Sequence, residues 1–248
     1  MVTLALSPGD PRTRSQKAKD ALAKELGKLR ERNCWDEKNV VEWEEVKRKH
    51  PGAHMATIFP LVGIKNHEQA EEFWKWKGRI VLGGHNIKST HGDKIAMFQD
   101  TASTPSSMAA ARAIIAAACL TPDSVILQSD CPNAYIQSEF TGPLTYERIP
   151  REWWPPAWSG MRDPVCKLLK SLYGHPSAGN GWQRHLEERL AKVGCAKIED
   201  WQSVYFNKDS GVSMVVYVDD LLGAGPEDAV RKAFAELSEL VDLDPPEW

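Results

Sequence analysis

Two groups of aspartates, far apart in the chain, each follow a short apolar segment. Asp219 and Asp220 come directly after residues 214–218, an apolar run that favours a β-strand. Asp130 follows soon after residues 125–127, Val-Ile-Leu, which also favour a strand. Charged groups beside a buried strand are unfavourable unless a cation balances them. Taken singly, each group also has a structural explanation, because Asp favours hairpin turns and caps helices and turns.

Taken together, the two groups predict a metal site. One aspartate at a strand end and two in a later hairpin turn are the carboxylates with which a nucleotidyl transferase holds two metal ions. Carboxylate oxygens suit Mg²⁺, which keeps water and substrate phosphates as its other ligands, and Mn²⁺ is an alternative. Two such ions about 4 Å apart can hold the attacking and leaving oxygens of an in-line displacement. We therefore expect Asp130, Asp219 and Asp220 to lie together.

The elements that must position these aspartates are helices mixed with antiparallel hairpins, which predicts an α+β fold. Helical patterns cover residues 15–32, 106–120 and 182–193, strand patterns cover 57–64, 79–82 and 124–129, a hairpin covers 203–222, and a last helix starts at 226. The 106–120 helix is rich in alanine and carries almost no charge except Arg112. We expect a helix of this composition to be buried.

Composition fits a globular protein. The 248 residues are 42% hydrophobic and 26% charged, enough for one large domain or two small ones. The net charge of −3 counts against a nucleic-acid enzyme, which is more often basic. The five cysteines contain no Cys-x-x-Cys pair, so neither a disulfide framework nor a zinc site is indicated. No signal peptide and no run of about 20 apolar residues is found, so we expect a cytoplasmic or nuclear protein without a membrane partner.

Four motifs, in order, resemble those of the reverse transcriptases of copia-type retrotransposons. Residues 217–220, Tyr-Val-Asp-Asp, resemble the signature turn of reverse transcriptases. Residues 165–174, Val-Cys-Lys-Leu-Leu-Lys-Ser-Leu-Tyr-Gly, and residues 128–137 around Asp130 resemble two further segments of the copia type. Residues 77–81, Lys-Gly-Arg-Ile-Val, resemble the family's Lys-Ala-Arg-Leu-Val in the fingers. The resemblance runs from about residue 15 to the end of the chain.

The resemblance implies an RNA-directed DNA polymerase with a fingers and palm fold, in which an antiparallel palm sheet packs on helices. After a disordered lead-in at residues 1–14, we expect this domain to cover residues 15–248. Fingers are expected at about 35–100 and 146–184, and palm at about 101–145 and 185–248. The family continues into a thumb and a ribonuclease H domain. We therefore expect a chain without a thumb, truncated and weak or inactive alone.

Carried over residue by residue, the resemblance implies a metal site. Asp130, Asp219 and Asp220 would hold two Mg²⁺ ions, with the backbone carbonyl of Cys131 as a further ligand. The resemblance also implies that the protein binds an RNA or DNA template with its primer and deoxynucleoside triphosphates. The oligomeric state stays open.

The resemblance also implies five nucleotide-binding residues. Tyr135 would lie under the incoming sugar and block a 2′-hydroxyl, and Arg79, with Lys77 or Lys65, would hold the triphosphate. Ser177 stands where the family has a glutamine that helps to seat the nucleotide, within the altered segment 175–180. The structural alternatives are a core position for Tyr135 and a solvated strand edge for the cations.

Two other functions are consistent with the sequence. Residues 65–100 hold six Lys/Arg and several aromatic residues, which suits a non-catalytic module that binds single-stranded nucleic acid, although five acids share the stretch. The same carboxylates could also serve a metal-dependent phosphohydrolase. Such an enzyme usually adds a histidine near the metal, and none of the seven histidines lies near Asp130 or Asp219 in sequence.

Overall fold

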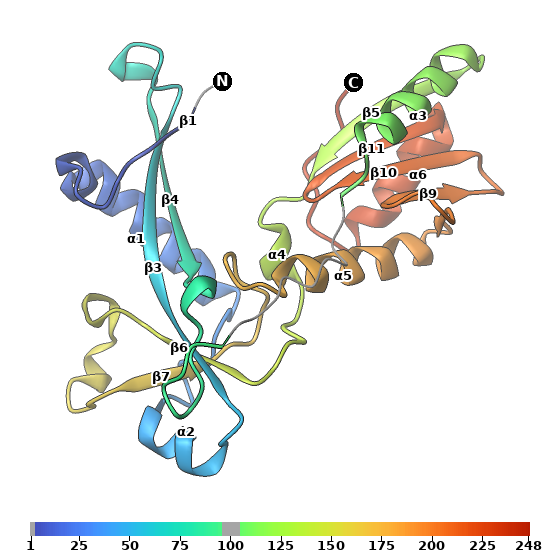
Figure 1. Ribbon diagram of the computed structural model, residues 1–248. Helices are drawn as coiled ribbons and strands as arrows, with labels where there is room; N and C mark the ends of the chain where they lie inside the picture. The colour runs from blue at the N-terminus through green and yellow to red at the C-terminus, as the bar shows by residue number, and fades with distance from the viewer. Residues whose placement is uncertain (1–2, 96–104) are drawn as a thin grey trace. The chain divides into compact units, whose positions relative to one another are not determined.

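The computed structural model describes residues 3–95 and 105–248 of the chain, which forms two compact units (Figure 1). Each unit mixes helices with strands, which confirms the predicted α+β class. The first unit comprises Met1–Gln99 and Glu139–Ala178, and the second comprises Asp100–Ser138 and Gly179–Trp248. Residues 1–2 of the predicted lead-in, and residues 96–104 at the predicted boundary between fingers and palm, lie outside the described residues.

The first unit is built on a six-stranded sheet. Its strands are β1 (Thr3–Ala5), β2 (Val41–Glu42), β3 (His54–Lys65), β4 (Lys75–Leu82), β6 (Thr145–Arg148) and β7 (Pro164–Lys167). Its helices are α1 (Gln16–Glu31) and α2 (Trp43–Lys49), with short 3-10 helices η1 (Pro11–Arg14), η2 (Glu71–Phe73), η3 (Gly84–Asn86), η4 (Arg151–Trp153) and η5 (Pro156–Trp158). The strands pair in the order β1-β3-β6-β7-β2, with β4 also on β3, so the long strand β3 joins all parts of this unit.

The β3–β4 hairpin has two chemically different faces. The antiparallel register places Lys65, Lys75, Lys77 and Arg79 on one face. Apolar side chains at the alternate positions, Val62, Ile64 and Trp76, pack with Leu6 and with Ala18 and Leu22 of α1. Because successive residues of a strand point to opposite faces, the burial of the apolar face fixes the four cations on the other face.

Residues 3–14, within the predicted disordered lead-in, include the strand β1 and the 3-10 helix η1. β1 pairs with β3, and Leu6 is buried against the same apolar face. The Asp10 carboxylate accepts a hydrogen bond of 2.9 Å from the Arg12 amide at η1, and the Ser15 hydroxyl caps α1. Pro8 and Gly9 form a turn and Pro11 begins η1, while Leu6 before them packs with Val62 and Ile64.

The second unit is built on a five-stranded antiparallel sheet. Its strands are β5 (Ser124–Asp130), β8 (Ala196–Lys197), β9 (Val204–Asn207), β10 (Val212–Tyr217) and β11 (Asp220–Pro226). Its helices are α3 (Met108–Leu120), α4 (Ala134–Gln137), α5 (Ala178–Lys192) and α6 (Glu227–Ser238). The strands pair in the order β5-β11-β10-β9-β8, which makes β5 an edge strand next to β11.

Helices cover both faces of this second sheet. Val212, Met214 and Val216 of β10 belong to one core, which they share with residues of α5 and α6 such as Phe234. Val215 points to the opposite face and packs with residues of α3. Successive residues of β10 therefore face the two helical layers in turn.

The prediction that the 106–120 helix is buried is wrong. Within α3, Ala110 and Ala118 are buried, whereas Met108 is 67% and Leu120 is 85% exposed. The helix covers one face of the sheet only, so its outer side meets solvent despite its composition. Among the described residues, no helix has both the length and the apolar character needed to cross a membrane.

The close approach of α1 to the β3–β4 hairpin depends on Gly78. A Cβ atom at Gly78 would lie 2.7 Å from the backbone of Ala21. We therefore expect Gly78→Ala to lower the free energy of unfolding by about 1–3 kcal/mol, measured by chemical denaturation. Gly27→Ala is the control, because a Cβ there meets nothing within 4 Å; it is expected to stabilise α1 by about 0.5–1 kcal/mol. Equal denaturation midpoints for the two variants would contradict this packing.

Candidate active site

A two-residue turn joins β10 to β11 and carries the paired aspartates. Tyr217 pairs with Asp220 across the hairpin, so Val218 and Asp219 form the turn. Val218 has a φ of 61°, in the left-handed region. Turns of this kind prefer Gly, Asn or Asp, and a β-branched residue there is a strong outlier. The turn therefore stores strain of about 1–2 kcal/mol.

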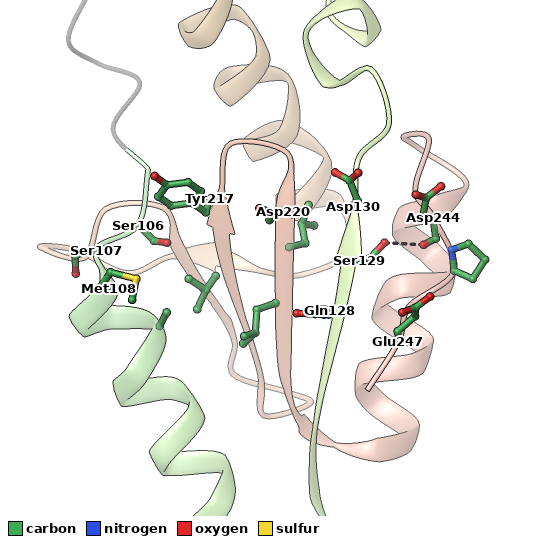
Figure 2. A pocket seen from close by; sticks show the side chains of 15 residues that line it. Ser106, Ser107, Met108, Gln128, Ser129, Asp130, Tyr217, Asp220, Asp244 and Glu247 are labelled. Carbon is green, nitrogen blue, oxygen red and sulfur yellow. Dashed lines mark hydrogen bonds between the residues drawn. The ribbon is translucent and has the colours of Figure 1, made fainter. Parts of the chain in front are cut away.

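The edge strand β5 brings the third aspartate beside the other two. Asp130 and Asp220 are direct cross-strand partners, so their side chains lie on the same face of the sheet, with Cβ atoms about 4.5–5.5 Å apart. The Cys131 amide donates a hydrogen bond of 2.7 Å to the carbonyl of Asp219, which ties the end of β5 to the turn. Figure 2 shows Asp130 and Asp220 at the same end of neighbouring strands. All three aspartates are exposed.

Partial burial and neighbouring carboxylates raise the proton affinity of Asp130 and Asp220. The pKa of Asp130 lies above its ordinary value because of partial burial and then because of the charges of Asp219, Asp220 and Asp244. The pKa of Asp220 is also raised, by partial burial and by Asp219. None of the ion pairs formed within residues 3–95 and 105–248 involves Asp130, Asp219 or Asp220. This end of the sheet therefore favours binding of an added cation.

Asp244 is a further acidic residue of this site that sequence reasoning missed. The Asp244 amide donates to the Asp130 carbonyl at 2.9 Å. The Ser129 hydroxyl donates to the Asp244 carbonyl at 2.6 Å (Figure 2). Gln128 and Glu247 exchange two backbone hydrogen bonds of 2.8 Å. The last residues therefore extend the sheet beyond β5. Because this pairing joins residues more than 100 positions apart, no local pattern in the sequence announces it.

A cavity of about 490 Å³ opens beside the carboxylates. Its lining includes Asp130, Asp220 and Asp244, together with Ser106, Gln128 and Tyr217 (Figure 2). The acidic and neutral polar groups lie at the strand ends, and the wall formed by α3 contributes Met108 and Ala111. This cavity is therefore open to water and anionic at one end.

The donor types at this site fit Mg²⁺. In the part of the chain that the structure describes, no three His, Cys, Asp or Glu side chains are arranged to hold a metal. The exposed carboxylates of Asp130 and Asp220 have room to rotate, and hard oxygen ligands suit Mg²⁺. Burial raises the pKa of the Cys131 thiol, which disfavours a thiolate at this position.

The predicted nucleotide-binding residues fall into both units. Tyr135, on α4 of the second unit, is half-buried and lines a small cavity with Trp182 and Val218, next to the turn. In the first unit, Arg79, Lys77 and Lys65 share one face of the β3–β4 hairpin, and the Arg79 guanidinium lies 5.7 Å from the centre of the Tyr173 ring.

Ser177 lies just before α5, where the segment departs from the pattern that the sequence resembles. Its amide donates a hydrogen bond of 3.0 Å to Nδ1 of His175. His175 is 4% exposed, and its carbonyl accepts from the Ala178 amide at 3.0 Å. The altered residues therefore satisfy the first free amides of the helix and preserve its start.

A family model for reverse transcriptase (RNA-dependent DNA polymerase) matches residues 51–242. The match covers most of the chain, which therefore belongs to the reverse transcriptase family.

Yeast retrotransposon proteins are similar to parts of this chain. A Ty5-1 transposon protein of Saccharomyces cerevisiae is 30% identical over 122 residues, which cover 46% of this chain and 38% of that protein. The truncated Ty1-A and the Ty1-DR5 Gag-Pol polyproteins are each 33% identical over 98 residues, or 39% of this chain, and the match covers 7% and 5% of their lengths. The chain thus matches only a small part of the Ty1 polyproteins. These relatives confirm the predicted resemblance to the copia type.

The mutual repulsion of the carboxylates predicts a pH-dependent gain in stability for Asp220→Asn without metal. The pKa of Asp220 is raised in the folded state, so the wild type loses stability as pH rises through that pKa. We expect the free energy of unfolding at pH 7, measured by chemical denaturation, to be higher in the variant than in the wild type, by less than about 1 kcal/mol. The gain should vanish below the ordinary pKa of 3.8.

Asp209→Asn, in the exposed turn between β9 and β10, is the matched control and should show no such gain. Added Mg²⁺ should stabilise the wild type more than Asp220→Asn. An identical pH dependence of stability for all three proteins would contradict the electrostatic account of the site.

Proposed function

We propose that the chain is the polymerase core of a copia-type reverse transcriptase, which extends a primer along an RNA or DNA template. Asp130, Asp219 and Asp220 would hold two Mg²⁺ ions, with the Cys131 carbonyl as a further ligand, and Mn²⁺ could replace Mg²⁺. The second unit acts as palm, with its antiparallel sheet, and the first unit acts as fingers. The observation that carries the proposal is the register that makes Asp130 and Asp220 cross-strand partners beside the Asp219 turn.

The reaction is an in-line phosphoryl transfer. The 3′-hydroxyl oxygen of the primer forms a bond to the α-phosphorus of a deoxynucleoside triphosphate, the bond to the bridging oxygen breaks, and pyrophosphate leaves while the hydroxyl proton passes to solvent. When bound, the two metal ions supply acidification of the hydroxyl and neutralisation of the leaving group. The protein contributes position and charge, which carry most of the catalysis in this kind of transfer.

The remaining residues act on the nucleotide. Arg79 suits the triphosphate, because its planar guanidinium bonds phosphate oxygens in pairs, and Lys77 and Lys65 add charge from the same hairpin face. Tyr135 lies against the sugar and excludes a 2′-hydroxyl. Ser177 stands in place of the glutamine that helps to seat the nucleotide in the family. We therefore expect this segment to bind the nucleotide more weakly.

The cationic hairpin face supports a second candidate function. Lys65, Lys75, Lys77 and Arg79 are neighbours on one face, which suits binding to a nucleic-acid backbone without catalysis. Such a module would bind single strands without a divalent metal and would not extend a primer. A phosphohydrolase would instead release free phosphate.

Primer extension tests the proposed polymerase. Purified protein is incubated with an RNA template, a DNA primer, deoxynucleotides and Mg²⁺ or Mn²⁺. We expect weak extension, which falls by at least about 100-fold in Asp219→Asn because the metal site loses one charged ligand. Asp209→Asn is the control and should extend like the wild type. Metal-independent binding without extension would favour the second candidate, and phosphate release would favour the hydrolase.

Discrimination between sugars tests Tyr135. We expect Tyr135→Val to raise the relative use of ribonucleotides by about tenfold or more, because the ring no longer fills the space of a 2′-hydroxyl. The measurement is the ratio of kcat/KM for a deoxynucleotide and the matching ribonucleotide. Tyr217→Phe, which keeps an exposed ring at the base of the turn, is the control. An unchanged ratio in Tyr135→Val would assign Tyr135 to the core instead.

A further inference from the structure

The strained turn that carries Asp219 is held by groups outside the hairpin. Val218, at a φ of 61°, occupies a conformation that disfavours β-branched side chains, so the isolated turn would relax. Two successive peptide groups of the turn accept hydrogen bonds from other elements: the Val218 carbonyl from α5 and the Asp219 carbonyl from the residue after β5. The turn is thus restrained at both peptides that flank the Asp219 side chain.

Trp182 provides the contact from α5. Its indole Nε1–H donates a hydrogen bond of 2.7 Å to the carbonyl of Val218. This carbonyl belongs to the peptide between Val218 and Asp219, so the bond limits rotation of the backbone that aims the Asp219 carboxylate. The second restraint, from the Cys131 amide to the Asp219 carbonyl, also measures 2.7 Å. Trp182 therefore acts on the turn from one side and β5 acts from the other.

The indole is itself rigid. Trp182 is 2% exposed, and its ring stacks on His185 with centroids 5.7 Å apart and planes at 26°. It packs in the same core as Leu186 and Val216. Because an indole has one hydrogen-bond donor and no acceptor, the bond to the Val218 carbonyl uses its whole hydrogen-bonding capacity. A ring fixed in this way transmits the position of α5 to the turn.

Trp182 also borders Tyr135. Both side chains line the same small cavity, of about 50 Å³, together with Val218. The indole of Trp182 therefore borders the same cavity as Tyr135, in addition to its hydrogen bond with the turn.

We propose that Trp182 is a positioning residue, whose indole N–H holds the strained Val218–Asp219 turn in the conformation that presents Asp219 to the metal ions. The metal part rests on the proposed function. A core role alone would depend on the ring's apolar area, most of which phenylalanine retains, whereas the positioning role requires the N–H donor. Trp182→Phe separates the two.

The experiment measures two properties of Trp182→Phe in the full chain. We expect hydrogen exchange of the Cys131 amide to accelerate, because that amide is bonded to the same turn. We expect Mn²⁺ binding, followed by electron paramagnetic resonance, to weaken by about tenfold, the usual scale for loss of a group that orients a ligand. Trp201→Phe, at a tryptophan of the same unit that is 39% exposed, is the control and should change neither.

Val218→Gly supplies the coupling test. Glycine adopts a positive φ without penalty, so the turn then needs less restraint. In that background we expect Trp182→Phe to weaken Mn²⁺ binding by less than about threefold. Equal losses in both backgrounds would overturn the proposed link between Trp182 and turn strain.

Two outcomes distinguish this proposal from the proposed function. The first outcome is faster exchange of the Cys131 amide in Trp182→Phe, with no Mn²⁺ binding even in the wild type. It would contradict the proposed metal site but support the restraint of the turn by Trp182. Unchanged Cys131 exchange and unchanged Mn²⁺ affinity would overturn the positioning role. If Trp182→Phe does not fold, exchange of the Trp182 indole N–H in the wild type decides: slow exchange is expected, and free exchange with solvent would overturn the proposal.

Discussion

The pairing of β5 with β11 is the constraint on which the rest of this site depends. The strands are antiparallel, and the register sets Asp130 opposite Asp220. A shift by one residue would turn one of these side chains to the other face of the sheet. The register is fixed by apolar residues further along the strands, such as Leu127 and Leu221, which are buried in the core beneath the sheet. Packing far from the carboxylates therefore determines whether they meet.

The charged end of the sheet is less stable than its core. Carboxylates crowded at one edge repel one another, and the pKa values of Asp130 and Asp220 are raised by partial burial and then by this repulsion. The strained residue Val218 adds a further unfavourable contribution at the same place. Local strain and like charges of this kind often occur together at functional sites, where the surrounding fold maintains them. Here the apolar core shared by β10, α5 and α6 maintains them.

Local patterns in the sequence predict much of this arrangement. The apolar run at residues 214–218 and the turn residues before it predict the hairpin, and the strand that ends at Asp130 predicts a second carboxylate nearby. Features that depend on distant partners are different. The burial of Leu6 makes the lead-in ordered, and a single covered face leaves α3 exposed. The approach of Asp244 and the bond from Trp182 to the turn arise from pairings across more than 30 residues, which a local pattern does not encode.

Anomalous scattering from crystals grown with Mn²⁺ and a deoxynucleoside triphosphate tests the central claim most directly. The account predicts two manganese peaks about 4 Å apart, bridged by carboxylate oxygens of Asp130 and of the Asp219–Asp220 pair, with phosphate oxygens completing their coordination. Manganese bound only elsewhere, or a nucleotide bound without metal at these aspartates, would contradict it.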